Sequence, residues 1–199
     1  MTVESGVRPS THRRGAAGHV PGEAELWIFI MGDLTVFGVF FTIWAWNYAR
    51  HPQLFELGRA SMSQPIGLAE TLTLISSSAA VVIALTHARW EQWSRAYRCY
   101  LAAIGFGGVF VVLQAIEYGR HLSVDAHALA GEFFMYYFVF TGIHLLHVLV
   151  GLLGLSAAAR SMRANAPRRC STALLEGIGV YWHMVDVLWV VLFSLIYLI

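Results

Sequence analysis

The sequence predicts an all-α, polytopic membrane protein: a bundle of five transmembrane helices with its N-terminus in the cytoplasm and its C-terminus outside. Three observations lead to this fold class. The 199 residues are 57% hydrophobic and only 13% charged, with a mean hydropathy of +0.60, whereas soluble domains carry about 25% charged residues. Long apolar segments recur along the chain, and the arginines fall unequally on their two sides. These apolar runs are continuous rather than alternating, which excludes a β-barrel.

A helix needs about 20 apolar residues to cross the hydrocarbon core of a bilayer. On this criterion we expect five helices, at about 26–48, 66–87, 97–116, 133–158 and 174–199. Residues 1–24 contain Pro, Gly, Ser, His and Arg but no apolar run, so they predict a disordered cytosolic tail without a cleavable signal peptide. The membrane domain then covers residues 25–199, and its links are too short to hold a second folded domain.

The arginines predict the orientation, because basic residues concentrate on the cytoplasmic side of membrane proteins. One set lies in the tail, after the second expected span and after the fourth: Arg8, Arg13, Arg14, Arg89, Arg95, Arg98, Arg160, Arg163, Arg168 and Arg169. The remaining links carry only Arg50, Arg59 and Arg120. The N-terminus is therefore expected inside and the C-terminus outside.

Ionisable side chains within or at the ends of the expected spans are costly in lipid and must face protein or water. Six of them are candidate site residues: Asp33, Glu117, His144, His147, His183 and Asp186. Polar and small residues also recur every three or four positions, as in the series Thr141, His144, His147, Gly151 and in the series Glu70, Thr73, Ser77. Such stripes predict a hydrogen-bonded polar seam between closely packed helices.

Three interpretations of this seam remain open. His144, His147 and His183 could bind a metal or haem, since His at positions i and i+3 can share a metal, although no HExxH or paired ExxH motif is present. Asp33, Glu117, His183 and Asp186 could form a proton path. Alternatively, the polar groups fix the register of the helices through interhelical hydrogen bonds.

Other features have simpler explanations. The net charge of +1 argues against a nucleic-acid partner. Cys99 and Cys170 lie far apart and show neither metal spacing nor a disulfide framework. Most tryptophans, including Trp44 and Trp46, cluster at helix ends, as in the aromatic belts of membrane interfaces, whereas Trp182 and Trp189 lie inside the last helix and are expected to be packing residues.

Two motifs stand out in the fourth and fifth expected helices. Residues 141–148 read TGIHLLHV and are followed by Gly151, and residues 181–186 read YWHMVD and are followed by Trp189. They resemble the patterns TGxHxxHVxxG and YWHxVDxxW of the subunit III family of haem–copper oxidases. Residues 114–118, QAIEY, resemble the family's QxxEY, and Ser76 to Ser78 give a further match in the second helix. The resemblance covers roughly residues 23–199.

The chain departs from the family in two respects. The full-length form has seven helices, and this chain matches the last five, which removes one wall of the family's lipid-holding cleft. The family usually places Ser-Glu in the first of these five helices, with the Glu a reactive carboxylate, where this chain has Gly32-Asp33. A short form with Gly-Asp resembles the E-type accessory protein of nitric oxide reductases, and also short bacterial oxidase subunits III.

The resemblance implies an accessory subunit of a bacterial haem–copper oxidase or nitric oxide reductase. Such a subunit carries no catalytic site, haem or copper of its own. It would lie in the plasma membrane among lipids, beside catalytic subunit I (and II), supporting respiratory electron transport, complex stability and proton uptake. Two alternatives belong to other classes: a small membrane transporter or channel, which would show inverted repeats or broken helices, and a self-contained membrane redox enzyme, which would show cofactor absorbance.

Overall fold

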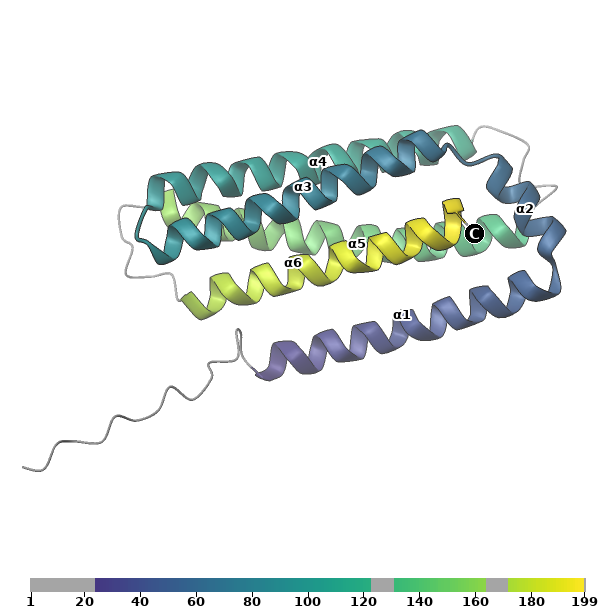
Figure 1. Ribbon diagram of the computed structural model, residues 1–199, viewed down its shortest axis with the longest axis horizontal. Coiled ribbons are helices and arrows are strands. Elements are labelled where there is room, and N and C mark those ends of the chain that lie inside the picture. The colour runs from purple at the N-terminus through teal and green to yellow at the C-terminus, as the bar shows by residue number, and fades with distance from the viewer. Residues whose placement is uncertain (1–23, 123–130, 164–171, 199) are drawn as a thin grey trace, which may run out of the picture.

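The computed structural model describes residues 24–122, 131–163 and 172–198, and it is helical almost throughout this part of the chain (Figure 1). The predicted tail lies outside the described residues, apart from Ala24. The elements are α1 (Ala24–Arg50), α2 (Pro52–Ala60), α3 (Gln64–Arg89), α4 (Trp93–Leu122), α5 (Gly131–Arg163), α6 (Thr172–Phe193) and a terminal π-helical turn, η3 (Ser194–Leu198).

Five spans in the described residues are long and apolar enough to cross a membrane, which confirms the predicted number. Each spanning helix begins two to four residues before its predicted start, and α4 also continues from the predicted end at Ile116 to Leu122. Polar residues can continue a helix into the interface, and Arg120 and His121 in the last turn of α4 complement the negative end of its dipole. Apolar length therefore marks the membrane-embedded part of a helix rather than its ends.

The sequence did not predict α2, which occupies what was expected to be a polar link. Pro52 stands at the start of this helix, where its missing N–H costs nothing. Its side chains divide by face, with Phe55 and Gly58 buried and most of the others at least partly exposed. Phe55 makes edge-on contacts with Trp44 of α1 and Phe133 of α5, so α2 ties α1 to the rest of the protein.

Helices α3, α4, α5 and α6 form a four-helix bundle, and α1 lies along its outside next to α6 (Figure 1). In the most apolar window of α1 only 11% of residues are buried, compared with 44% in the span that contains α6. The apolar outer face of α1, with Ile28, Met31 and Trp46 exposed, suits contact with acyl chains. The bundle proper is therefore formed by four helices, with the fifth attached at its edge.

The core of the bundle is built on large aromatic residues set against glycines. Trp182 and Trp189 are fully buried, which confirms the prediction that they are packing residues. The Trp182 ring lies against the α5 backbone, where a Cβ atom added at Gly151 would be 2.5 Å from Trp182 Cε3. Trp44 was wrongly assigned to an interface belt. It is 2% exposed and packs among aromatic rings of α2 and α5, because α2 folds back over the end of α1.

Candidate functional site

The first polar cluster joins α1 to α5. His147 Nε2 lies 3.1 Å from Asp33 Oδ1, and both side chains are largely buried. His147 Nδ1 lies 2.7 Å from the carbonyl oxygen of Ile143, which can only accept a hydrogen bond, so Nδ1 carries a hydrogen. The Tyr181 hydroxyl of α6 donates to the carbonyl oxygen of His147 at 3.2 Å. His147 of α5 thus connects to α1 through Asp33 and to α6 through Tyr181.

The second cluster lies between α3 and α6. His183 Nδ1 is 2.5 Å from Ser78 Oγ and 3.9 Å from Asp186 Oδ2. The His183 side chain is 38% exposed, whereas that of Asp186 is 10% exposed. The histidine therefore sits at the surface of the bundle, about halfway along its span, with the aspartate behind it.

The third cluster surrounds Glu117, near the C-terminal end of α4. Its Oε2 atom accepts hydrogen bonds from the hydroxyls of Tyr197, in η3, and Tyr137, in α5, the latter at 3.2 Å. Gln114 Nε2 donates to the Tyr137 hydroxyl at 3.2 Å. Glu70 of α3 is fully buried nearby, close enough for its charge to interact with that of Glu117. This cluster joins α3, α4, α5 and the C-terminal turn.

His144 stands apart from these clusters. It is fully buried, and neither ring nitrogen has a hydrogen-bond partner among the described residues. Its ring packs between Phe110 and Trp189, with centroid distances of 5.8 and 5.1 Å. Its surroundings are therefore those of an aromatic packing residue.

The six sequence-predicted residues thus occupy several separate places. The structure brings together Asp33 with His147, and His183 with Asp186, but places Glu117 and His144 elsewhere. Within the described ranges no three His, Cys, Asp or Glu side chains come close enough to hold a metal ion. Ser78, Tyr137, Tyr197 and Glu70 complete the clusters and were not among the candidate residues. Glu70 could have been chosen as a candidate from the sequence, because a carboxylate in an apolar helix requires a polar environment.

Comparison with known proteins identifies the family. The model of the family described as cytochrome c oxidase subunit III matches residues 23–199. A probable quinol oxidase subunit 3 of Staphylococcus aureus (strain USA300) is 26% identical over 180 residues, covering 87% of this chain and 86% of its own. A protein of the same description from Staphylococcus saprophyticus is 24% identical over the same shares. The chain belongs to the subunit III family of haem–copper oxidases.

As a subunit III, this chain is a multi-pass membrane protein that associates with other subunits of an oxidase complex. The two motifs of the resemblance lie on α5 and α6, which pack against each other. His147 and His183 of these motifs face different neighbours, Asp33 of α1 and Ser78 of α3. The motif residues therefore hold α5 and α6 to the helices on either side.

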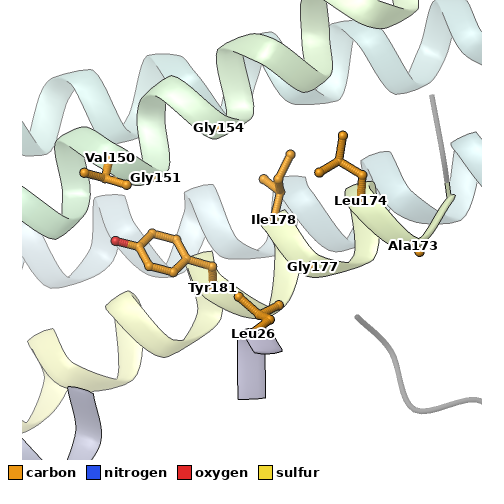
Figure 2. A pocket seen from close by; sticks show the side chains of 9 residues that line it. All are labelled: Leu26, Val150, Gly151, Gly154, Ala173, Leu174, Gly177, Ile178 and Tyr181. Atoms are coloured by element: carbon orange, nitrogen blue, oxygen red, sulfur yellow. The ribbon is translucent and has the colours of Figure 1, made fainter. Parts of the chain in front are cut away.

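This subunit III also has an apolar groove of about 390 Å³ between α1, α5 and α6 (Figure 2). The residues that line it are apolar apart from Tyr181: Leu26, Val150, Gly151, Gly154, Ala173, Leu174, Gly177, Ile178 and Tyr181. The only side-chain polar atom among them is the Tyr181 hydroxyl, which points along α5 and donates to His147. The groove therefore offers hydrocarbon contacts and no set of ligands for a polar cofactor.

Proposed function

We propose that this chain is the non-catalytic third subunit of a bacterial haem–copper terminal oxidase. It lies in the plasma membrane with its N-terminus in the cytoplasm and packs laterally against catalytic subunit I. Haem and copper belong to subunits I and II, and this chain holds neither. Its task is to stabilise the assembled complex. The family membership of the whole membrane domain supports this proposal.

The observation that carries the proposal is the partly exposed His183 at the α3–α6 face. His183 lies ten residues into the span Ala173–Leu198, and Ser78 lies near the middle of Gln64–Arg89. Lipid tails offer an imidazole no hydrogen bond, so an exposed histidine at this depth must face water or another protein. The exposed residues beside it, such as Val187 and Val190, are apolar, as expected of a helix-packing surface.

The relatives named above are quinol oxidase subunits, which favours an oxygen-reducing partner for this chain over a nitric oxide reductase. We therefore propose a quinol oxidase complex of the haem–copper type. The two possibilities differ in the catalytic subunit that co-purifies with the chain, and in whether the purified complex reduces oxygen or nitric oxide.

The test is co-purification from membranes in which the chain is expressed with subunits I and II of a haem–copper quinol oxidase, with the affinity tag on subunit I. We expect wild-type chain in equal amount with subunit I. His183→Leu removes the polar contact and should weaken association about tenfold, the effect of losing roughly 1.4 kcal/mol of association energy, so that less chain than subunit I is recovered. A photoreactive residue at Val187, on the same face, should cross-link to subunit I, while one at Leu146 of α5 should label lipid.

Thr35→Val is the matched control, because it also exchanges a polar for an apolar side chain, and the exposed Thr35 hydroxyl donates within α1 itself, to the Met31 carbonyl at 2.7 Å. It should leave recovery unchanged. Full recovery of a folded His183→Leu chain would contradict the proposed interface. Stoichiometric haem or copper in the isolated chain, lost on His183→Leu, would instead establish a self-contained redox enzyme.

A further inference from the structure

Two carboxyl groups lie in the interior of the bundle, away from the face that we assign to the catalytic subunit. Glu70 of α3 and Glu117 of α4 are both fully buried. Tyr197 links them, because its ring packs over Gly67, one turn before Glu70, while its hydroxyl donates to Glu117. At this separation a charge on one carboxyl disfavours a charge on the other. Arg120, at the exposed end of α4, acts on Glu117. Two such groups cannot both be charged in a low-dielectric interior.

The hydrogen bonds around this pair leave acceptors without donors. Glu117 Oε2 accepts from the hydroxyls of Tyr137 and Tyr197. Four further oxygens have no hydrogen bond in the described part of the chain: both oxygens of Glu70, Oε1 of Glu117 and Oε1 of Gln114. The backbone N–H of Ser63 is also directed at the Glu117 carboxyl, whereas Glu70 has no such donor among the same residues. Gln114 is an uncharged residue that is also fully buried, and its amide nitrogen already donates to Tyr137. The cluster therefore contains more hydrogen-bond acceptors than hydrogen-bond donors.

A proton on one carboxyl would supply the missing donor, because a protonated carboxyl is an O–H donor whereas a carboxylate only accepts. Glu117 already has two tyrosine hydroxyls directed at one of its oxygens, an arrangement that suits the charged form. Glu70 receives no hydrogen bond in the structure. The proton is therefore better placed on Glu70.

We propose that Glu70 and Glu117 form a buried proton-binding site, in which one proton is carried on Glu70 and donated to the free oxygen of Glu117. The titratable and charged groups around this pair come from α4, α5 and η3: Arg120, Tyr118, Tyr137, Tyr197 and the buried His121, whose ring packs on Tyr137. The site bonds α3 to α4 through the shared proton and bonds both to the C-terminal turn through Tyr197.

The surroundings of the pair show the side from which a proton would reach it. Tyr197 packs over Gly67, one turn before Glu70, so closely that a Cβ atom added at Gly67 would lie 2.9 Å from Tyr197 Cε1. Beyond this turn is a polar surface hollow of about 650 Å³, lined by residues that include Arg59, Ser63 and Gln64. Arg59 and Gln64 donate to the carbonyl oxygens of Leu198 and Tyr197. The terminal turn thus separates the pair from this hollow, at the end opposite the Arg89 end of α3.

Infrared spectroscopy of the purified full-length chain tests the proposal, because carboxylic acid and carboxylate absorb separately. At neutral pH we expect a carboxylic acid band from the wild-type chain and the loss of one equivalent per chain on Glu70→Gln. The Gln amide supplies an N–H donor in place of the O–H, so thermal stability should stay close to that of wild type. Glu56→Gln, on the exposed side of α2, is the matched control and should leave the band unchanged.

Three results would overturn the shared proton: absence of a carboxylic acid band in the wild-type chain, an unchanged band in Glu70→Gln, or a bound hard cation. The last would appear as a rise in the melting temperature of wild type, but not of Glu70→Gln, on addition of Na⁺ or Ca²⁺, because an all-oxygen set suits such ions. If Glu70→Gln fails to fold, the wild-type spectrum still tests the proposal, because the absence of a carboxylic acid band would refute it.

Discussion

Asp33 of α1 and His147 of α5 form a largely buried polar contact, with His147 Nε2 3.1 Å from Asp33 Oδ1. The other ring nitrogen, Nδ1, lies 2.7 Å from the Ile143 carbonyl oxygen, so the backbone of α5 fixes the orientation of the ring toward Asp33. This contact ties α1 to the four-helix bundle by a polar interaction. Aromatic contacts, such as those of Trp44 with Phe55 and Phe133, also attach α1.

We predict that the attachment of α1 depends on this pair. Asp33→Leu should lower the free energy of unfolding by about 1.5–3 kcal/mol, the range for a hydrogen bond to a charged group. Asp33→Asn should cost less than about 1.5 kcal/mol, because the amide can donate to Nε2. The measurement is thermal or denaturant unfolding of the purified chain in detergent.

A double-mutant cycle gives the internal control for this pair. If the two side chains act together, Asp33→Leu combined with His147→Leu should cost clearly less than the sum of the single variants. Additive losses would mean that the two residues stabilise the fold independently, contrary to a direct bond between them.

The two tryptophans near the end of α1 should behave differently. Trp44 is 2% exposed and packs against Phe55, Phe133 and Phe140, whereas Trp46 is 62% exposed and has the Arg50 guanidinium 4.8 Å from its ring. Trp44→Ala should therefore cost about 3–5 kcal/mol, and Trp46→Ala at most about 1 kcal/mol. Comparable losses in the melting temperatures of the two variants would argue against the aromatic attachment of α1.

The sequence was sufficient to predict the spans but not how they meet. Apolar length predicted five helices, and the three- or four-residue spacing predicted that Glu70, Ser77, Thr141 and His144 face inward, which their burial confirms. Periodicity says which face of a helix is buried, but not which helix covers it. The pairing of Asp33 with His147, and of His183 with Ser78, depends on the packing of helices far apart in the sequence.

The two wrong predictions, for α2 and for Trp44, share a physical cause. α2 has nine residues, too few to give a spanning signal, and its buried Phe55 is its main indication. Trp44 stands near a helix end, where tryptophans usually meet the membrane interface. It is buried only because α2 and α5 cover it. Both errors come from contacts that a chain segment cannot reveal on its own.

Packing of α6 on α5 should depend on the absence of a side chain at Gly151. A Cβ atom there would be 2.5 and 2.7 Å from two atoms of the fully buried Trp182 ring, and Trp182 is held on its other side by Gly107, where an added Cβ would be 3.1 Å from its Cη2 atom. The ring cannot move away, so Gly151→Ala should destabilise the chain by about 1–3 kcal/mol, as overpacking does.

Gly105→Ala is the control for this prediction, because nothing lies within 4 Å of a Cβ atom at that position of α4. It should be neutral or stabilise the helix by up to about 1 kcal/mol. A Gly151→Ala chain as stable as Gly105→Ala would mean that α6 packs differently on α5 than the structure shows.

The arginine bias predicts which end of the bundle is cytoplasmic, and the helices place the two arginine sets at opposite ends. Arg89 and Arg163 lie at the ends of α3 and α5, whereas Arg50 and Arg120 lie at the ends of α1 and α4. Basic side chains are retained on the cytoplasmic side. In a chain with Cys99→Ser and Cys170→Ser, a cysteine at Gln92 should therefore resist an impermeant thiol reagent in intact cells and react in inverted vesicles. A cysteine at Gln53, at the other end, should do the opposite, and the reverse pattern at both sites would invert the proposed topology.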